Sequence, residues 1–161
     1  MRWLAGCWVA VGGVLWPLVS EAVEPDASWH EVQLYTVATL QLPPGAELRE
    51  DKVRHPDFLI YRVFSGGAEV LGIYLGNAAG FPNRGAAKEV TVGPCSGLNA
   101  VSHDDGGASR DALLLIRTQY GFPSDVHFFY RRLGAAAAER SDAIIANIAL
   151  TEAAQCSGER R

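Results

Sequence analysis

The side chains with the greatest chemical potential in this chain are His103-Asp104-Asp105, which precede Gly106-Gly107. Two carboxylates beside an imidazole could hold a hard cation. A protein metal site normally has three or four ligands at suitable spacing, and nothing else in the sequence completes this one. The segment also fits a solvated turn, because Asp and Gly both suit turn geometry. We therefore predict no metal ligand and no cofactor, and keep a small-ligand or metal-binding module that uses the turn 103–107 as an alternative function.

Catalytic signatures are absent from the sequence. No Gly-x-Ser-x-Gly pentapeptide marks a serine nucleophile, and Ser65-Gly66-Gly67 fits a hairpin turn. His127 alternates with apolar neighbours, as a structural histidine on a strand does. A pair of carboxylates across a cleft could hydrolyse a glycosidic bond, and four acids lie close in sequence: Glu47, Glu50, Asp51 and Asp57. Strand and turn surfaces routinely carry such charges, so we predict no catalytic residue and keep a hydrolase with scattered carboxylates as a second alternative.

The segment from Gly76 to Gly85 is the best candidate for a surface that binds a partner. Its Asn and Gly residues can fix an unusual backbone turn, its phenylalanine could anchor a partner protein, and its arginine could pair with an anion. The predicted partner-binding residues are Asn77, Phe81, Asn83 and Arg84. The alternative is structural, because long connections often bury one aromatic side chain to hold their shape. Phe81 would then pack back onto the sheet.

Aromatic residues are concentrated in the C-terminal half of the chain: Tyr120, Phe122, Phe128, Phe129 and Tyr130. Alternation along a strand places Phe128 and Tyr130 on one face and Phe129 on the other. Most of these rings are expected in the core. A sheet face that no helix covers would present the remaining ones as a binding strip.

The start of the chain predicts the cellular location of the protein. Arg2 precedes an apolar run from Trp3 to Val19, and Ser20-Glu21-Ala22 supplies small residues around a cleavage site. This layout is typical of a secretory signal peptide over residues 1–22. The alternative is an uncleaved anchor, since 17 apolar residues are at the lower edge of a membrane span. We expect a periplasmic or secreted protein of the bacterial envelope, without stable membrane insertion after cleavage.

The charge of the chain argues against nucleic acid as a partner. The formal net charge is −4, and removal of residues 1–22 leaves it unchanged because Arg2 and Glu21 cancel. Neutralising several phosphates needs a cluster of cations on one face. The only adjacent basic pairs are Arg131-Arg132 and Arg160-Arg161, so we expect no nucleic-acid binding.

Cysteine usage predicts one disulfide. Cys7 leaves with the signal peptide, and the two remaining cysteines, Cys95 and Cys156, would pair in an oxidising compartment. Such a bridge would enclose about 60 residues and contribute roughly 4 kcal/mol in the chain-entropy model. The competing interpretation of Cys95 is a reactive thiol in a turn, but no histidine partner is evident.

The elements that must position these residues are mainly strands, followed by one helix. Strands are expected over 32–42, 58–64, 68–75, 89–92, 98–102, 110–118 and 126–131. The segments 58–64 and 68–75 form a hairpin through Gly66-Gly67. A helical stripe then follows: Ala137, Ser141, Ile144, Ile145 and Ile148. The predicted fold class is α+β, an antiparallel meander covered by a C-terminal helix. One domain spans residues 23–151, and residues 152–161 form a polar tail that the disulfide could tether.

Two stretches resemble segments of small exported bacterial proteins, most of them uncharacterised. The first is Leu71-Gly72-Ile73-Tyr74-Leu75-Gly76-Asn77 with Phe81-Pro82, and the second is 122–130 with the helix that follows. The order of strands closing with a helix is similar to the Mog1/PsbP-like fold, a compact α+β sandwich. The resemblance implies a binding or assembly module and no catalytic residues.

These observations together predict an exported, non-enzymatic protein that binds another envelope protein, as an assembly factor or a toxin-neutralising inhibitor. The prediction depends on the signal peptide, a compact domain of about 139 residues, and the lack of a catalytic arrangement.

Overall fold

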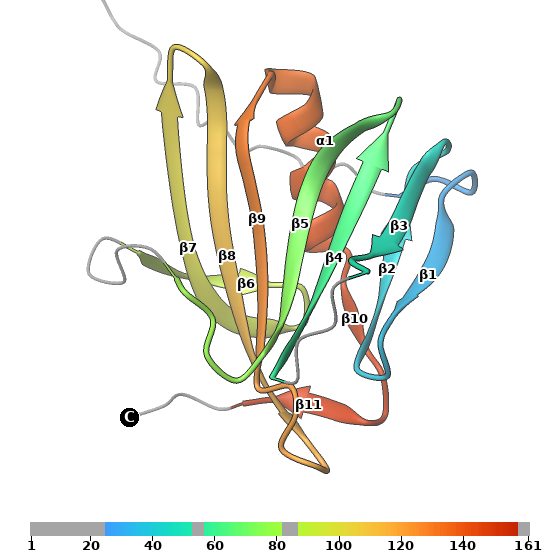
Figure 1. Ribbon diagram of the computed structural model, residues 1–161, viewed down its shortest axis with the longest axis vertical. Helices are drawn as coiled ribbons and strands as arrows, with labels where there is room; N and C mark the ends of the chain where they lie inside the picture. The colour runs from blue at the N-terminus through green and yellow to red at the C-terminus, as the bar shows by residue number, and fades with distance from the viewer. Residues whose placement is uncertain (1–24, 53–56, 82–86, 158–161) are drawn as a thin grey trace, which may run out of the picture.

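The computed structural model describes residues 25–52, 57–81 and 87–157, and Figure 1 shows the arrangement of their strands and helix. The predicted signal segment 1–22 lies outside the described residues. Among those residues 59% are in strands and 10% in helix, so the predicted α+β class is wrong: the protein is mostly antiparallel β. The prediction failed because a single helix of twelve residues is a minor part of a chain that folds into two sheets, and because three short strands were not expected. No helix within the described ranges is long and apolar enough to cross a membrane.

A large antiparallel sheet forms most of the molecule. Its strands follow the order β3 (Ala46–Glu50), β4 (Phe58–Ser65), β5 (Ala68–Gly76), β9 (Asp125–Leu133), β8 (Gly107–Thr118), β7 (Cys95–Asp104) and β6 (Lys88–Val92). The predicted hairpin is confirmed as β4–β5, and its turn uses positive φ angles at Gly66 and Gly67. The sheet is not one meander, however. It joins two meanders, β3–β4–β5 and β6–β7–β8–β9, through the pairing of β5 with β9.

A second, smaller sheet contains β1 (His30–Leu34), β2 (Ala38–Leu42) and β10 (Ala149–Leu150). The segment 32–42, expected as one strand, is instead a hairpin. Tyr35 has a φ of 52°, and the chain reverses there so that Leu34 lies opposite Ala38. The reversal lets the apolar side chains of both strands reach the core, where Leu34, Leu40 and Leu42 are fully buried.

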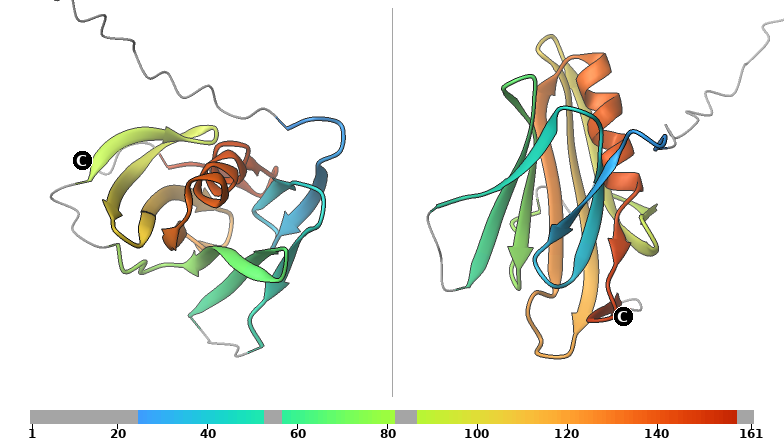
Figure 2. Two further views of the ribbon diagram at one scale, coloured as in Figure 1. Left: turned by 90° about the horizontal axis from the view of Figure 1, so that it is seen from above. Right: turned by 90° about the vertical axis from the view of Figure 1, so that its right-hand side faces the viewer.

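The helix α1 (Ala135–Ala146) lies inside the curve of the large sheet, as the view from above shows (Figure 2). It contacts β2, β5, β8 and β9. The expected apolar stripe is buried at Ser141, Ile144 and Ile145, and Ile148 is buried just beyond the helix. Ser141 satisfies its hydroxyl by donating to the Val70 and Ala137 carbonyl oxygens, both at 2.9 Å. The helix therefore contributes a central part of the core rather than an outer layer.

The two faces of the large sheet have different environments. We call the face toward α1 the inner face; it carries the main core, including Leu71, Ile73, Leu114 and Phe128. We call the opposite face the outer face. A smaller core lies there, where Ala79 and Phe81 from the connection after β5 pack against Leu113. Because strand side chains alternate, β8 supplies both cores from neighbouring residues.

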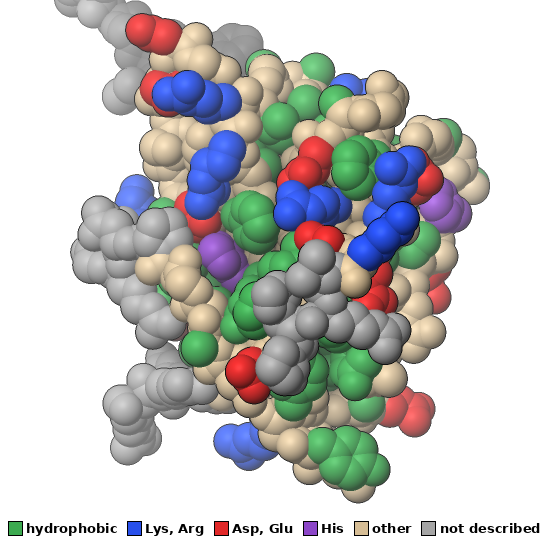
Figure 3. All heavy atoms as spheres, in the orientation of Figure 1, with side chains coloured by type: hydrophobic (Ala, Val, Ile, Leu, Met, Phe, Trp, Pro, Cys, Tyr) green, Lys and Arg blue, Asp and Glu red, His purple; other side chains and the backbone are tan. Residues whose placement is uncertain are grey.

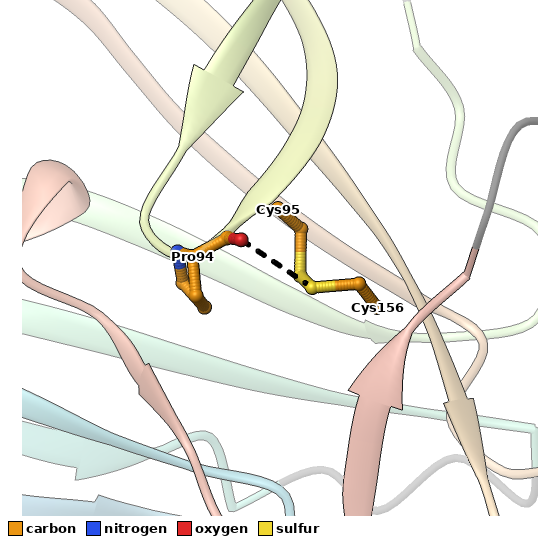
Figure 4. Close-up of a disulfide and its surroundings, with 3 residues drawn as sticks. All are labelled: Pro94, Cys95 and Cys156. Atoms are coloured by element: carbon orange, nitrogen blue, oxygen red, sulfur yellow. Dashed lines mark hydrogen bonds between the residues drawn. A yellow bond between two sulfur atoms is a disulfide. The ribbon is translucent and has the colours of Figure 1, made fainter.

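The predicted disulfide between Cys95 and Cys156 is confirmed, with a Cα–Cα distance of 5.4 Å (Figure 4). The Pro94 carbonyl oxygen lies 3.5 Å from the Cys156 sulfur. Cys156 belongs to β11 (Ala154–Cys156), which pairs with the end of β8. The folded unit thus extends past residue 151, where we placed the domain boundary, and the tail is part of the sheet up to Cys156.

Candidate functional site

A groove with a volume of about 740 Å³ lies between α1 and the inner face of β7 and β8. We call it the α1–β7 groove. Figure 2 shows how the large sheet curls around the helix on this side. Its strand wall consists of Asn99, Val101, His103, Ala108, Arg110 and Tyr130. Its helix wall consists of Ala135, Ala138, Glu139, Asp142, Ala143 and Ala146, and Asp104, Gly107 and Leu133 complete it. Its volume falls within the range of small-molecule sites.

Small side chains leave the groove open. The residues of the helix wall lie on one face of α1, as the spacing of Ala135, Glu139, Asp142 and Ala146 shows. Four of the six residues of this wall are alanine. The opposite wall exposes an apolar side chain, since Val101 is 50% exposed on a strand face that points toward the helix. An apolar residue of a sheet face next to a helix is normally covered. Here the alanines do not reach it, so apolar surface remains for a ligand.

A polar network forms the floor of the groove. Arg110 donates from Nε to Asn99 Oδ1 at 2.7 Å and from Nη1 to Asp142 Oδ1 at 2.8 Å. The Tyr130 hydroxyl donates to the same Asp142 oxygen at 2.9 Å. Burial and the Asp142 carboxylate raise the pKa of Tyr130 above its ordinary value. The tyrosine therefore remains a neutral hydrogen-bond donor, and Asp142 is held in one orientation by two donors from the sheet.

The network leaves part of its hydrogen-bonding capacity unused. Neither Arg110 Nη2 nor Asp142 Oδ2 forms a hydrogen bond with another residue in the described part of the chain. The side chain of Arg110 is 15% exposed and that of Asp142 is 45% exposed. A ligand in the groove would thus find fixed donor and acceptor groups within mostly apolar walls, which is the usual composition of a small-molecule site.

A second charged cluster lies on the outer face. Asp111 Oδ1 accepts hydrogen bonds from His127 Nε2 at 2.9 Å and from Arg131 Nη2 at 2.7 Å. Burial tends to raise the pKa of Asp111, but these two hydrogen bonds outweigh it and hold the pKa of that carboxyl below its ordinary value. The His127 ring lies between Phe81 and Phe129, with centroid distances of 5.6 and 5.5 Å. The His127 ring is therefore buried between two aromatic rings and hydrogen-bonded on this face.

The connection after β5 was the predicted partner-binding segment, and two of its four predicted residues are described. Asn77 is exposed, but its side-chain oxygen accepts a hydrogen bond from the Ser124 N–H at 3.0 Å. Phe81 is 8% exposed and packs on the outer face, as in the structural alternative. Asp125 holds the segment by accepting a hydrogen bond from the Ala79 N–H at 3.0 Å. Asn83 and Arg84 lie outside the described residues.

The turn 103–107 connects β7 to β8 and lies at one end of the α1–β7 groove. Asp104 accepts hydrogen bonds from the Gly106 N–H at 2.8 Å and from Arg132 Nε at 3.3 Å, so it shapes the turn. His103, Asp104 and Gly107 line the groove. Within residues 25–52, 57–81 and 87–157, no three His, Cys, Asp or Glu side chains are grouped as a metal site would need.

Three residues of the groove floor, Asn99, Arg110 and Asp142, were not predicted as site residues, and Tyr130 was considered only as an aromatic of the core or of a binding strip. One signal was present. Arg110 occupies the same strand face as Ala108, Ala112 and Leu114, so the alternation of β8 places a guanidinium on the inner face. A charged residue at a position directed inward is unusual unless it is paired or functional.

Comparisons with known proteins give little beyond the geometry. No protein-family model matches the sequence, and no curated protein does. A crystal structure of a protein from Bacteroides thetaiotaomicron VPI-5482 is similar over 71% of this chain and 45% of its own, with a TM-score of 0.38 and 10% identity. The chain therefore spans less than half the length of that protein, and the similarity is too low to inform the fold or the function.

Proposed function

We propose that this protein is an exported, non-enzymatic binding protein that holds a small ligand with an apolar body in the α1–β7 groove. The observation that carries the proposal is the open groove of about 740 Å³, with alanine walls and a fixed polar floor. This is the small-ligand alternative of the sequence analysis, with the turn 103–107 at one end of the site. The disulfide supports export, because such bridges persist in oxidising compartments.

A fluorescence titration with Nile red, a neutral apolar dye, tests the proposal. Ala135 and Ala146 line the groove and are exposed, so Ala135→Trp and Ala146→Trp should fill it without disturbing the core. Ala136 is exposed on the same helix but does not line the groove, which makes Ala136→Trp a matched control. We expect one saturable site, with affinity at least tenfold lower in the two groove variants and unchanged in the control. Equal affinity in all four proteins would reject the groove as the binding site.

A second candidate function is binding of another envelope protein through the outer face. Its support is a set of half-buried aromatic side chains on that face: Phe58, Phe64, Tyr74 and Phe129. Phe58 and Tyr74 stack at 5.4 Å, and Arg49 lies 4.5 Å from the centre of the Phe64 ring. Figure 3 views this side of the molecule and shows hydrophobic side chains among acidic and basic ones. Such a mixture is typical of a protein interface.

Site-specific crosslinking separates the two functions. A photoreactive residue in place of Phe129 should crosslink a defined envelope protein in living cells, because this ring lies on the outer face. The same residue at Tyr120, which is 88% exposed in the turn between β8 and β9, is the control. The same crosslinked bands at both positions, or none at Phe129, would leave the outer face without a specific partner.

A further inference from the structure

We propose that the ligand of the α1–β7 groove is a cationic amphiphile, an apolar chain that ends in an ammonium group, with Glu139 and Asp142 as the residues that receive the charge. The inference rests on the proposed function, since it names the chemical class of ligand for the same groove. Three observations carry it: the apolar walls, the charge balance of the lining, and the fixed orientation of Asp142.

The residues that line the groove carry a net negative charge. Asp104, Glu139 and Asp142 contribute three carboxylates, and Arg110 contributes the one guanidinium. Arg110 is already paired with Asp142 at 2.8 Å, and Asp104 is paired with Arg132 at 3.3 Å. Glu139 has no ion pair or hydrogen bond to another described residue through its side chain. One negative charge therefore remains uncompensated in the groove and favours a cation.

The position of the two helix carboxylates suits an ammonium group. Glu139 and Asp142 are three residues apart, so they are neighbours on one face of α1. Asp142 Oδ1 is occupied by Arg110 and Tyr130, which leaves Oδ2 as an oriented acceptor. An ammonium group has three donors and could bond to both carboxylates at once.

The apolar walls specify the rest of the ligand. Val101 and Leu133 line the groove on the strand side, and Ala135 and Ala146 line it on the helix side. An alkyl chain laid between them would bury apolar surface that the protein leaves exposed. An anionic head group would have to approach Arg110 beside the free oxygen of Asp142 and the charge of Glu139. We therefore favour the cation over an anion.

The test compares three probes with the same chain and different head groups: octylammonium, octanol and octanoate. Each displaces Nile red from the full mature protein, at concentrations below self-association. We expect octylammonium to bind about fivefold more tightly than octanol, as an ion pair near the surface gives, and octanoate to bind more weakly than both. The preference should decrease as salt is added.

Matched variants assign the preference to the groove. Glu139→Gln removes the uncompensated charge and should reduce the ratio of octylammonium to octanol affinity to about one. Glu152→Gln makes the same change at an exposed site that does not line the groove, and should leave the ratio unchanged. Because both glutamates are exposed, neither variant is expected to unfold the protein.

The possible outcomes separate the inference from the proposed function. Equal binding of the three probes to the wild type would overturn the cation preference and leave the groove as a ligand site. Tighter binding of octanoate would overturn it in favour of an anion at Arg110. A preference that persists in Glu139→Gln would overturn the role of Glu139, because another part of the protein would then recognise the ammonium group. Absence of binding by all three probes and by Nile red would reject the proposed function itself.

Discussion

The disulfide between Cys95 and Cys156 allows a stability prediction with a magnitude. The two residues are separated by 61 positions in the sequence. Closing a loop of that length in the unfolded chain corresponds to about 4 kcal/mol at 25 °C in the chain-entropy model. The double variant Cys95→Ala/Cys156→Ala should therefore lower the free energy of unfolding by about 4 kcal/mol, a large part of the stability of a domain of this size.

Urea unfolding of the chain from residue 23 to residue 161 provides the assay. Trp29 is the only tryptophan beyond residue 22, and it packs against the main core, so its fluorescence reports on the folded state. With a slope of roughly 2 kcal/mol per molar urea, the loss corresponds to a decrease of about 2 M in the midpoint. Reduction of the wild-type protein should give a similar decrease, because it opens the same loop without removing side-chain atoms.

A small effect would refute this reasoning. Backbone pairing holds β11 to β8, whereas the bridge joins β11 to β7. If the midpoint decreased by less than about 0.5 M in both the variant and the reduced protein, loop closure in the unfolded state would not be the main contribution of the bridge. Far-UV circular dichroism before unfolding checks that the variant begins from the native fold.

Three further predictions test the packing and the charged cluster. Ile145→Asp should unfold the domain, since this side chain is 1% exposed in the main core; a melting curve like that of the wild type would contradict the packing. Gly72→Ala should destabilise the protein by about 1–3 kcal/mol, because its Cβ would clash with the Phe129 ring, and Phe129→Leu in the same chain should recover part of the loss in thermal unfolding. The lowered pKa of Asp111 means that its ionised form is more stable in the folded state. Its contribution is present above the unfolded pKa of about 3.9 and is lost as the pH falls through the folded pKa, so urea midpoints measured from pH 7 to pH 2 should fall less steeply in Asp111→Asn than in the wild type.

Local features of the fold could be predicted from the sequence. The β4–β5 hairpin follows from two apolar runs and a Gly-Gly turn, and the buried side of α1 follows from the spacing of Ser141, Ile144 and Ile145. The disulfide follows from the cysteine count beyond residue 22, where only Cys95 and Cys156 occur. The hairpin and the helix depend on residues that are near in sequence. The disulfide could be predicted because two cysteines allow only one intramolecular pairing.

Features that depend on distant pairings could not be predicted in the same way. β5 and β9 pair across about fifty residues, with Gly76 opposite Asp125, and nothing in either strand specifies the other. One hint was available in β8, where Ala112 to Ile116 is an apolar run without alternation. Such a run indicates burial on both faces, and the structure has a core on each side of that strand. The groove depends on how far the sheet curls past the helix, so the sequence could not predict that the residues of its floor lie together.

The helix α1 uses its two sides for different purposes, and this supports a binding function. The side with Ser141, Ile144 and Ile145 is buried in the core. The adjoining side presents alanines to the half-exposed Val101 across the groove. Larger apolar residues at Ala135 or Ala146 would bury more surface, at about 25 cal/mol per Å², and would retain helix propensity. A chain selected for stability alone would be expected to fill this space. Open apolar walls above a fixed polar floor are instead the arrangement expected of the ligand site that we propose.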